Sequence, residues 1–313
     1  MLSMLFYLVI AGIPLSFLCG SVGLAAVSAP VRTRDRMSAR FLIWGAALVA
    51  TGAAATGLTA WSTSEDMHYD DFGSAMTALA GVYGAALLVL GLGPFVSLLL
   101  MTLRRRVALL PRALRPAVHQ AGAPAGTAAG VAATMVATAV AVALMIIAPA
   151  VTAQGRARDL QGYQPQTSWV YVVALLILLA LAGALAATRS AGSERVLRRL
   201  GGGSAVALRF LNGWRAAFRA ACGTVIGLAA GCVIGLSLAW PMTTYVDWEP
   251  APPRAPFETP WTAIAVLAAG LPVLAAAIAT LAPPTWLTRP ARASRPGLSA
   301  SPEPGRVAPA PEA

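Results

Sequence analysis

Long runs of apolar residues, interrupted by short polar stretches, make up most of the sequence. Each run could cross a hydrocarbon core of about 30 Å as an α-helix of roughly 20 residues. None of the runs contains Asp, Glu, Lys, Arg or His. The pattern therefore predicts an all-α polytopic membrane protein with seven transmembrane helices. The predicted spans are 4–27, 41–62, 75–103, 127–151, 168–188, 223–240 and 261–282.

Arginine is distributed very unevenly between the segments that connect these spans. The segments 28–40, 104–126, 189–222 and the residues after 282 hold 20 of the 23 basic residues, and the alternate segments hold three. Because positive charge is retained on the cytoplasmic side of a membrane, this bias predicts an outside N-terminus and a cytoplasmic C-terminus. We therefore expect a multi-pass protein of the plasma membrane.

The composition narrows the possible functions. Hydrophobic residues make up 58% of the chain and charged residues 11%, which is outside the range of soluble domains. Every basic residue is Arg, and a chain without Lys can form neither a P-loop nor a retinal Schiff base. The net charge of +11 is concentrated between the spans, so we expect anionic membrane lipids, and no nucleic acid, as partners of the arginines.

Residues 189–222 alternate apolar and basic side chains in a way that predicts two amphipathic helices at the cytoplasmic surface. In the first, three aliphatic residues oppose three arginines, and three consecutive glycines then end the helix. In the second, aromatic residues at every fourth position oppose a polar face, as in a helix that lies in the headgroup layer. The first set comprises Val196, Leu197 and Leu200 against Arg195, Arg198 and Arg199, and the second comprises Phe210, Trp214 and Phe218 against Arg209, Asn212, Arg215 and Arg219.

The second amphipathic helix continues without a helix breaker into a glycine-rich apolar span. Its glycines recur at every fourth residue and so lie along one face, where another helix could approach closely. This face could pack within the chain or could form the contact between two copies in a homodimer. The residues of this glycine ridge are Gly223, Gly227, Gly231 and Gly235.

The motif Glu194-Arg-Val-Leu-Arg-Arg-Leu-Gly201 comes before the basic helix and the glycine-rich span. This order resembles the FtsX-like (MacB/FtsX superfamily) permease domain of ABC transporters. The resemblance extends to the linker helices and C-terminal half of the long actinobacterial-type members. The residues that carry this wider similarity are Leu109–Arg115, the small-residue span 127–150, Tyr163–Pro165, Pro260–Trp261 and Gly270–Pro272.

The resemblance implies a permease subunit that is not an enzyme, because a separately encoded ATPase would hydrolyse ATP. A second permease half or a second copy of the chain would be a further partner. Within residues 189–222, which we call the lever, the motif positions imply an ATPase-coupling role. Lipid binding alone would also explain the amphipathic pattern, so both interpretations stay open. The expected coupling residues are Glu194, Leu197, Leu200 and Gly201.

The resemblance also implies how the chain is divided. We expect a three-helix N-terminal membrane segment (1–103), a basic cytoplasmic loop (104–126), a four-helix permease domain (127–282) and a disordered cytoplasmic tail (283–313). The chain departs from the family because only residues 152–167 stand in place of a large extracytoplasmic domain, and because a full first half is missing. The alternative function is therefore that of a degenerate relative without ATPase coupling, a structural or regulatory membrane protein.

Catalytic, cofactor-binding and metal-binding residues are not predicted. Spans without ionisable residues argue against ion-coupled carriers and intramembrane proteases, and both histidines, His68 and His119, lie between spans. The carboxylates of residues 65–71 could attract a hard cation, but their spacing matches no EF-hand, and a solvated acidic loop explains them better. The cysteines, which we expect to behave as small apolar residues, are Cys19, Cys222 and Cys232.

Overall fold

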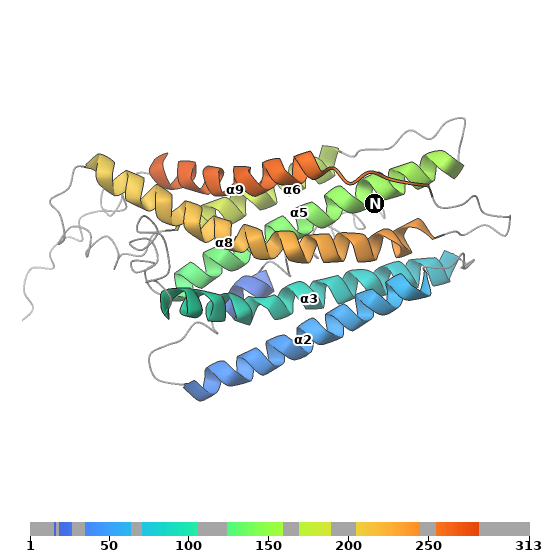
Figure 1. The fold of residues 1–313 in the computed structure, drawn as a ribbon, viewed down its shortest axis with the longest axis horizontal. Helices are drawn as coiled ribbons and strands as arrows, with labels where there is room; N and C mark the ends of the chain where they lie inside the picture. Colours follow the sequence, from blue (N-terminus) through green and yellow to red (C-terminus); the bar gives the residue numbers. More distant parts are fainter. Residues whose placement is uncertain are drawn as a thin grey trace, which may run out of the picture. The chain divides into compact units, whose positions relative to one another are not determined.

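The fold is almost entirely helical in the part of the chain that the structure, a computed structural model, describes. That part comprises residues 16, 19–26, 35–63, 71–105, 124–158, 169–188, 205–244 and 255–281, and none of these residues belongs to a strand. The elements are α2 (Asp35–Ser62), α3 (Asp71–Arg105), α5 (Pro124–Arg158), α6 (Trp169–Ala187), α8 (Ala205–Ala239), a short 3₁₀ turn η2 (Pro241–Thr243) and α9 (Trp261–Leu281), as Figure 1 shows.

Five described helices are long and apolar enough to cross a membrane, which agrees with the predicted helical membrane fold. α6 has 19 residues, or about 28 Å at 1.5 Å per residue, and its described apolar part is the shorter stretch Val172–Ala187. Of the first predicted span, only residues 16 and 19–26 are described. The total of seven spans therefore stays a prediction. The five apolar stretches are Ala39–Ser62, Ala75–Leu100, Gly126–Ala157, Arg209–Thr243 and Trp261–Leu281.

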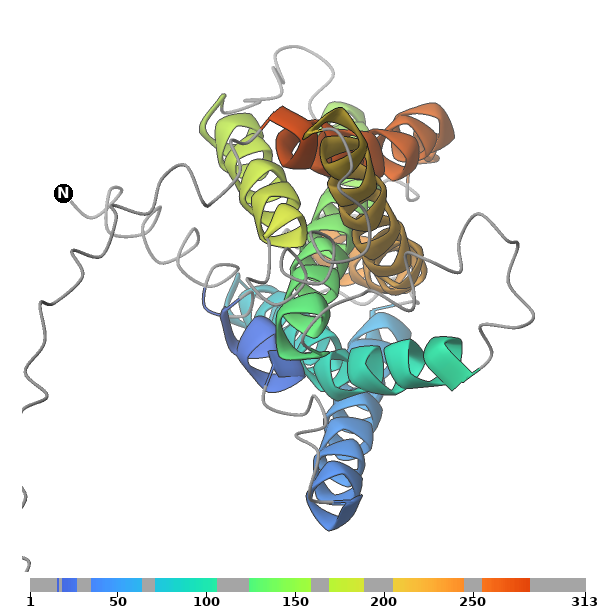
Figure 2. The same ribbon diagram turned by 90° about the vertical axis from the view of Figure 1, so that its left-hand side faces the viewer.

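α5 is the most enclosed of these helices. It packs against α3, α6, α8 and α9, and in Figure 2 its green ribbon runs between the other helices. Of the 18 residues that form the apolar segment of α5, 72% are buried, whereas the corresponding share is 17% in α2 and 22% in α9. Most of its buried side chains are Ala, Val and Thr, whose small size lets neighbouring backbones come close on several sides.

α2 and α9 expose large apolar side chains on their outer faces. Trp44 and Trp61 of α2 are 69% and 73% exposed, and Val266 of α9 is 71% exposed. Because lipid tails are as apolar as these side chains, such faces are suited to contact with a bilayer. The two helices therefore form the periphery of the described part.

α3 contains a proline, and the sequence predicts a bend there. Pro94 lies inside the helix, where it removes one backbone hydrogen bond and pushes away the preceding turn. In Figure 2 the teal C-terminal part of α3 turns away from the rest of the helix. Near this position the Ser97 hydroxyl donates a hydrogen bond of 3.2 Å to the carbonyl oxygen of Ala25, which fixes residues 19–26 against α3.

The start of α9 is held against the end of α5. The backbone N–H of Ala255 donates a hydrogen bond of 2.9 Å to the buried side-chain oxygen of Gln154 on α5. Phe257 then packs against the buried cluster of Val142, Ile146 and Ile264. This contact brings the non-helical residues 255–260 back to α5 and places Trp261 at the beginning of α9.

Candidate functional site

The structure describes the residues directly before the lever and the second part of the lever, residues 205–222. The motif residues Glu194, Leu197, Leu200 and Gly201 lie outside the described residues, which stop at Thr188 and resume at Ala205. The end of α6 comes before this gap and the start of α8 follows it. The candidate site is therefore built from α6, α8 and the helices that hold them.

α8 is one uninterrupted helix of 35 residues, as the absence of a helix breaker predicts. Ideal geometry gives it a length of about 52 Å, well above the roughly 30 Å of a hydrocarbon core. Its apolar stretch begins at Arg209, so the helix includes both the basic segment and the glycine-rich segment. A displacement at its N-terminal end can thus be carried along the whole helix.

The glycine ridge of α8 lies against α5. A Cβ atom added at Gly231 would be 2.8 Å from the carbonyl oxygen of Ala139, and one added at Gly235 would be 2.9 Å from the Cβ of Ile146. Real Cβ atoms essentially never come within 3.0 Å of another heavy atom. Glycine is therefore required along this contact, and the face that could have formed a homodimer is occupied within the chain.

The contact between the two helices keeps one register over about two turns. Added Cβ atoms at Gly223, Gly227 and Gly231 would meet the carbonyl oxygens of residues 131, 135 and 139 in that order. Both series advance by four residues, so α5 and α8 are parallel and side by side. At such short separations glycine Cα–H groups can form weak hydrogen bonds to the facing carbonyls.

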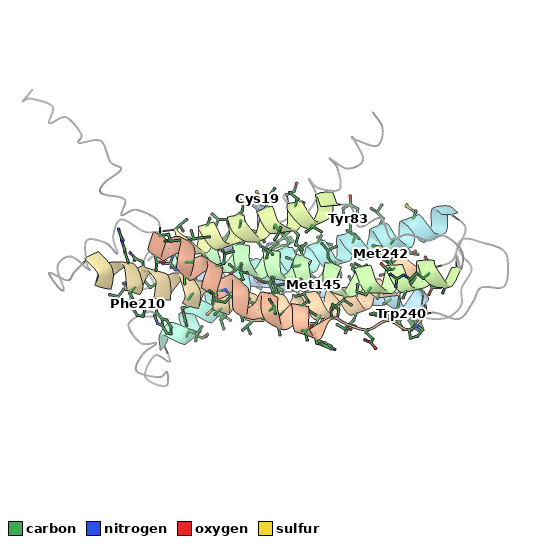
Figure 3. All side chains as sticks on the ribbon, turned by 90° about the horizontal axis from the view of Figure 1, so that it is seen from above. Cys19, Tyr83, Met145, Phe210, Trp240 and Met242 are labelled. Atoms are coloured by element: carbon green, nitrogen blue, oxygen red, sulfur yellow. The ribbon has the colours of Figure 1, made fainter. Side chains whose placement is uncertain are left out.

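Arg215 and Arg219 are buried in the bundle, which corrects the expectation that their face of the helix lies in the headgroup layer. They are only 6% and 7% exposed, whereas the aromatic side chains Phe210 and Trp214 are 71% and 40% exposed. Figure 3 places Phe210 and Trp240 toward opposite ends of the bundle. Arg219 faces inward because a neighbouring helix offers acceptors that the sequence pattern of α8 cannot reveal.

The acceptors of Arg219 are at the C-terminal end of α6. Its Nη1 donates hydrogen bonds to the carbonyl oxygens of Ala186, at 3.4 Å, and Thr188, at 2.9 Å. Carbonyls at a helix C-terminus have no intrahelical donor and carry a partial negative charge, so they favour a cation. Arg219, near the C-terminal end of the lever, therefore binds the end of α6, which comes directly before the lever.

Small residues bring α6, α8 and α9 close together around this junction. A Cβ atom added at Gly213 would be 2.5 Å from a methyl group of Thr280 on α9. One added at Gly130 of α5 would be 3.0 Å from the Cα of Ala186. A cluster of buried alanines completes the junction, and its members are Ala186, Ala216, Ala220, Ala275 and Ala279.

A second close contact, between α2 and α3, was not predicted from the sequence. Cβ atoms added at Gly45 and Gly52 would lie 2.9 Å and 2.5 Å from the carbonyl oxygens of Gly91 and Gly84, respectively. The pairing runs in opposite directions, so the two helices are antiparallel. The signal in the sequence is a pair of glycines seven residues apart on each helix, which places both on one face of a helix that packs at a shallow angle.

The remaining candidate residues do not assemble into a site within the described ranges. No group of three or more His, Cys, Asp or Glu side chains there could hold a metal ion. Both histidines and all but the last residue of the acidic loop lie outside these ranges, and Asp71 begins α3. The three cysteines are free.

Comparison with known proteins does not assign the chain to a family. Scans against protein-family models, curated proteins and solved structures found no match.

Proposed function

We propose that the chain is the permease subunit of an FtsX-like ABC transporter and works with a separately encoded ATPase. The observation that carries this proposal is the way the lever is attached. Arg219 of α8 is hydrogen-bonded to the end of α6, so the helices on either side of the motif Glu194–Gly201 are joined to each other. A force applied to the lever would therefore act on α6 and α8 together.

In this proposal the chain transmits movement and performs no chemistry. ATP hydrolysis by the partner displaces Glu194–Gly201, and α8 carries the displacement along its length. The glycine ridge passes it to α5, because the four ridge positions of α8 carry no side chains that could deform. Packed helices of this kind shift between discrete arrangements, which is how a small displacement at one end can change the opposite end of a bundle.

The docking contact can be tested at the lever. The change Leu197→Asp with Leu200→Asp would place unpaired carboxylates in an apolar contact, at a cost of about 2–5 kcal/mol, and should abolish co-purification of the ATPase. The matched control is Arg195→Gln with Arg198→Gln, which would remove lipid contacts of about 1 kcal/mol each and should leave ATPase binding nearly intact. Mass spectrometry of proteins attached to the tagged chain provides the measurement. If both variants keep the same partners, the docking interpretation is wrong.

The proposal also requires that the lever be cytoplasmic, with seven spans in the plasma membrane. The uneven distribution of arginine supports this orientation. Single cysteines at Ser64, Gln161 and Pro253 should react with an impermeant maleimide on intact cells, and cysteines at Ser38, Gly122 and Ser204 should not. Labelling in the reverse pattern would place the lever outside, where no ATPase could reach it.

A structural or regulatory membrane protein without ATPase coupling is the second candidate. One observation favours it: α5 ends at Arg158 and α6 begins at Trp169, which leaves only residues 159–168 where the family has a large extracytoplasmic domain. Substrate handling would then need another protein. Failure to recover any ATPase with the unmodified chain would support this candidate over the permease.

A further inference from the structure

The N-terminal half of α3 exposes apolar side chains on a face that is covered in its C-terminal half. Eighteen residues make about five turns of an α-helix, so positions 79 and 97 point in the same direction, and so do positions 75 and 93. Leu79 is 45% exposed and Ala75 is also exposed. Ser97 and Gly93 are buried. Tyr83, one turn after Leu79, is 54% exposed, so the cover of this face ends between the two halves of the helix.

The cover of the C-terminal half is the described segment 19–26. The Ser97 hydroxyl donates a hydrogen bond of 3.2 Å to the carbonyl oxygen of Ala25. A Cβ atom added at Gly93 would be 3.0 Å from the carbonyl oxygen of Ser21. Both pairs are 72 positions apart in the sequence, so the segment runs parallel to α3 and keeps one register with it.

Residues 4–18, nearly all of which lie outside the described residues, are the part of the chain that can extend this cover. They contain no charged side chain. At the same separation of 72 positions, Tyr7 falls opposite Leu79 and Ala11 falls opposite Tyr83. As a helix the segment would extend about 22 Å, and the rise of α3 from position 79 to position 93 is about 21 Å. The segment therefore has the polarity and the length to cover the exposed face.

Tyr83 favours a protein segment over lipid as the occupant of this face. The apolar stretch of α3 begins at Ala75, so Tyr83 lies about 12 Å along the helix into it, below the headgroup layer in which membrane tyrosines concentrate. A phenol hydroxyl at that depth needs a hydrogen-bond acceptor, which acyl chains do not offer. Pro14 has no N–H, so in a helix it leaves the carbonyl oxygen of Ile10 without an intrahelical donor. At the register above, Ile10 comes directly before the residue opposite Tyr83.

We propose that the exposed face of α3 at Leu79 and Tyr83 is the docking surface for residues 4–18 of the same chain. The segment continues the contact of residues 19–26 at the same register, and the Tyr83 hydroxyl donates to the carbonyl oxygen of Ile10. The first predicted span is then held by α3 along its whole length. The contact does not rest on the transporter assignment, because it involves only α3 and the N-terminal residues.

The test is disulfide cross-linking in isolated membranes, with the full-length chain and its three native cysteines replaced by alanine. A protease site inserted between residues 28 and 34 separates the first span from α3 after cleavage, unless a disulfide joins them. Tyr7→Cys with Leu79→Cys should keep the two fragments together on a non-reducing gel, because facing positions of packed helices bring Cβ atoms close to the separation that a disulfide needs. The described contact provides the positive control, Ala25→Cys with Ser97→Cys.

Two further pairs test the face and the register. Tyr7→Cys with Ala80→Cys moves one partner by about 100° around α3, and Leu18→Cys with Leu79→Cys moves the other by about 16 Å along it. Both should leave most of the fragments separate. Equal cross-linking of all three pairs would show random collision, and a joined positive control without a joined Tyr7–Leu79 pair would show that lipid covers this face. A disulfide between two copies of the chain would show that the face binds a second copy, and each of these results overturns the proposal.

The hydroxyl of Tyr83 gives an independent measurement. In thermal melting of the detergent-purified chain, Tyr83→Phe should lower the melting temperature by about 2–4 °C, the effect of one typical hydrogen bond. In a Pro14→Ala background the carbonyl oxygen of Ile10 gains an intrahelical donor, so the same change should have little effect. An equal loss in both backgrounds would show that the hydroxyl donates elsewhere, and no loss in either would show that it has no acceptor. Both results would contradict the register.

Discussion

Replacing Gly227 and Gly231 together by leucine is expected to lower the stability of the described helices strongly. An added Cβ at Gly231 already meets the carbonyl oxygen of Ala139, and one at Gly227 would be 2.7 Å from the Cβ of Thr138. These neighbours belong to, or are fixed to, the backbone of α5, so they cannot move aside as a flexible side chain would. Overpacking costs about 1–3 kcal/mol per site, which gives roughly 2–6 kcal/mol for the pair.

The measurement is thermal unfolding in detergent, where each 1 kcal/mol lowers the melting temperature by about 2–4 °C in a chain of comparable size. Gly270→Leu is the matched control, because this glycine is also in an apolar helix but has no atom within 4 Å of an added Cβ. It should melt like the unmodified chain. A double variant that melts at the unmodified temperature would show that α5 does not occupy the glycine ridge.

The spacing of apolar residues predicted most of the helices, because the length of an apolar run and the helical periodicity depend only on residues that are close in the sequence. The same spacing predicted the length of a helix less well. Residues 127–151 were predicted as a span, but α5 runs from Pro124 to Arg158. The length of α8 was expected, because the predicted amphipathic helix continues without a breaker into the span 223–240. An apolar run reports where a helix crosses the hydrocarbon core, whereas backbone hydrogen bonds continue through charged residues at either end.

The environment of Arg215 and Arg219 could not be predicted because it depends on residues distant in the sequence. The acceptor carbonyls of Arg219 are 31 and 33 residues away, at the end of another helix. An amphipathic pattern separates two faces of a helix, but it does not say which one meets lipid when the polar face has internal partners. Here the aromatic face is exposed and the two arginines are enclosed.

The glycine ridge was predictable because four glycines recur at every fourth residue, a run that is rare even in a chain with 29 glycines. The glycines of α2 and α3 gave no comparable signal. Each helix contributes two glycines spaced by seven residues, and further glycines such as Gly57 lie on the same helix without a role in packing. Only the pairing of the two helices shows which of them are required.

The glycines of α2 should differ strongly in their tolerance of a larger side chain, because Gly52 faces α3 and Gly57 does not. Gly52→Leu should detach α2 from α3, because an added Cβ would lie 2.5 Å from the carbonyl oxygen of Gly84 and from the backbone nitrogen of Leu88. α2 packs mainly on α3, with a smaller contact with α8, so it has little else to hold it. We expect a loss of about 1–3 kcal/mol, confined to this pair of helices.

Hydrogen–deuterium exchange in detergent provides the measurement, because it reports each helix separately. In Gly52→Leu the amides of α2 should exchange faster, while those of α5 and α8 should keep their protection. The control is Gly57→Leu on the same helix, five residues further on, where an added Cβ meets nothing within 4 Å. Faster exchange in both variants would mean that bulk anywhere on α2 is disruptive. Faster exchange of α5 and α8 in Gly52→Leu alone would mean that α2 supports the whole bundle, which its 17% burial argues against.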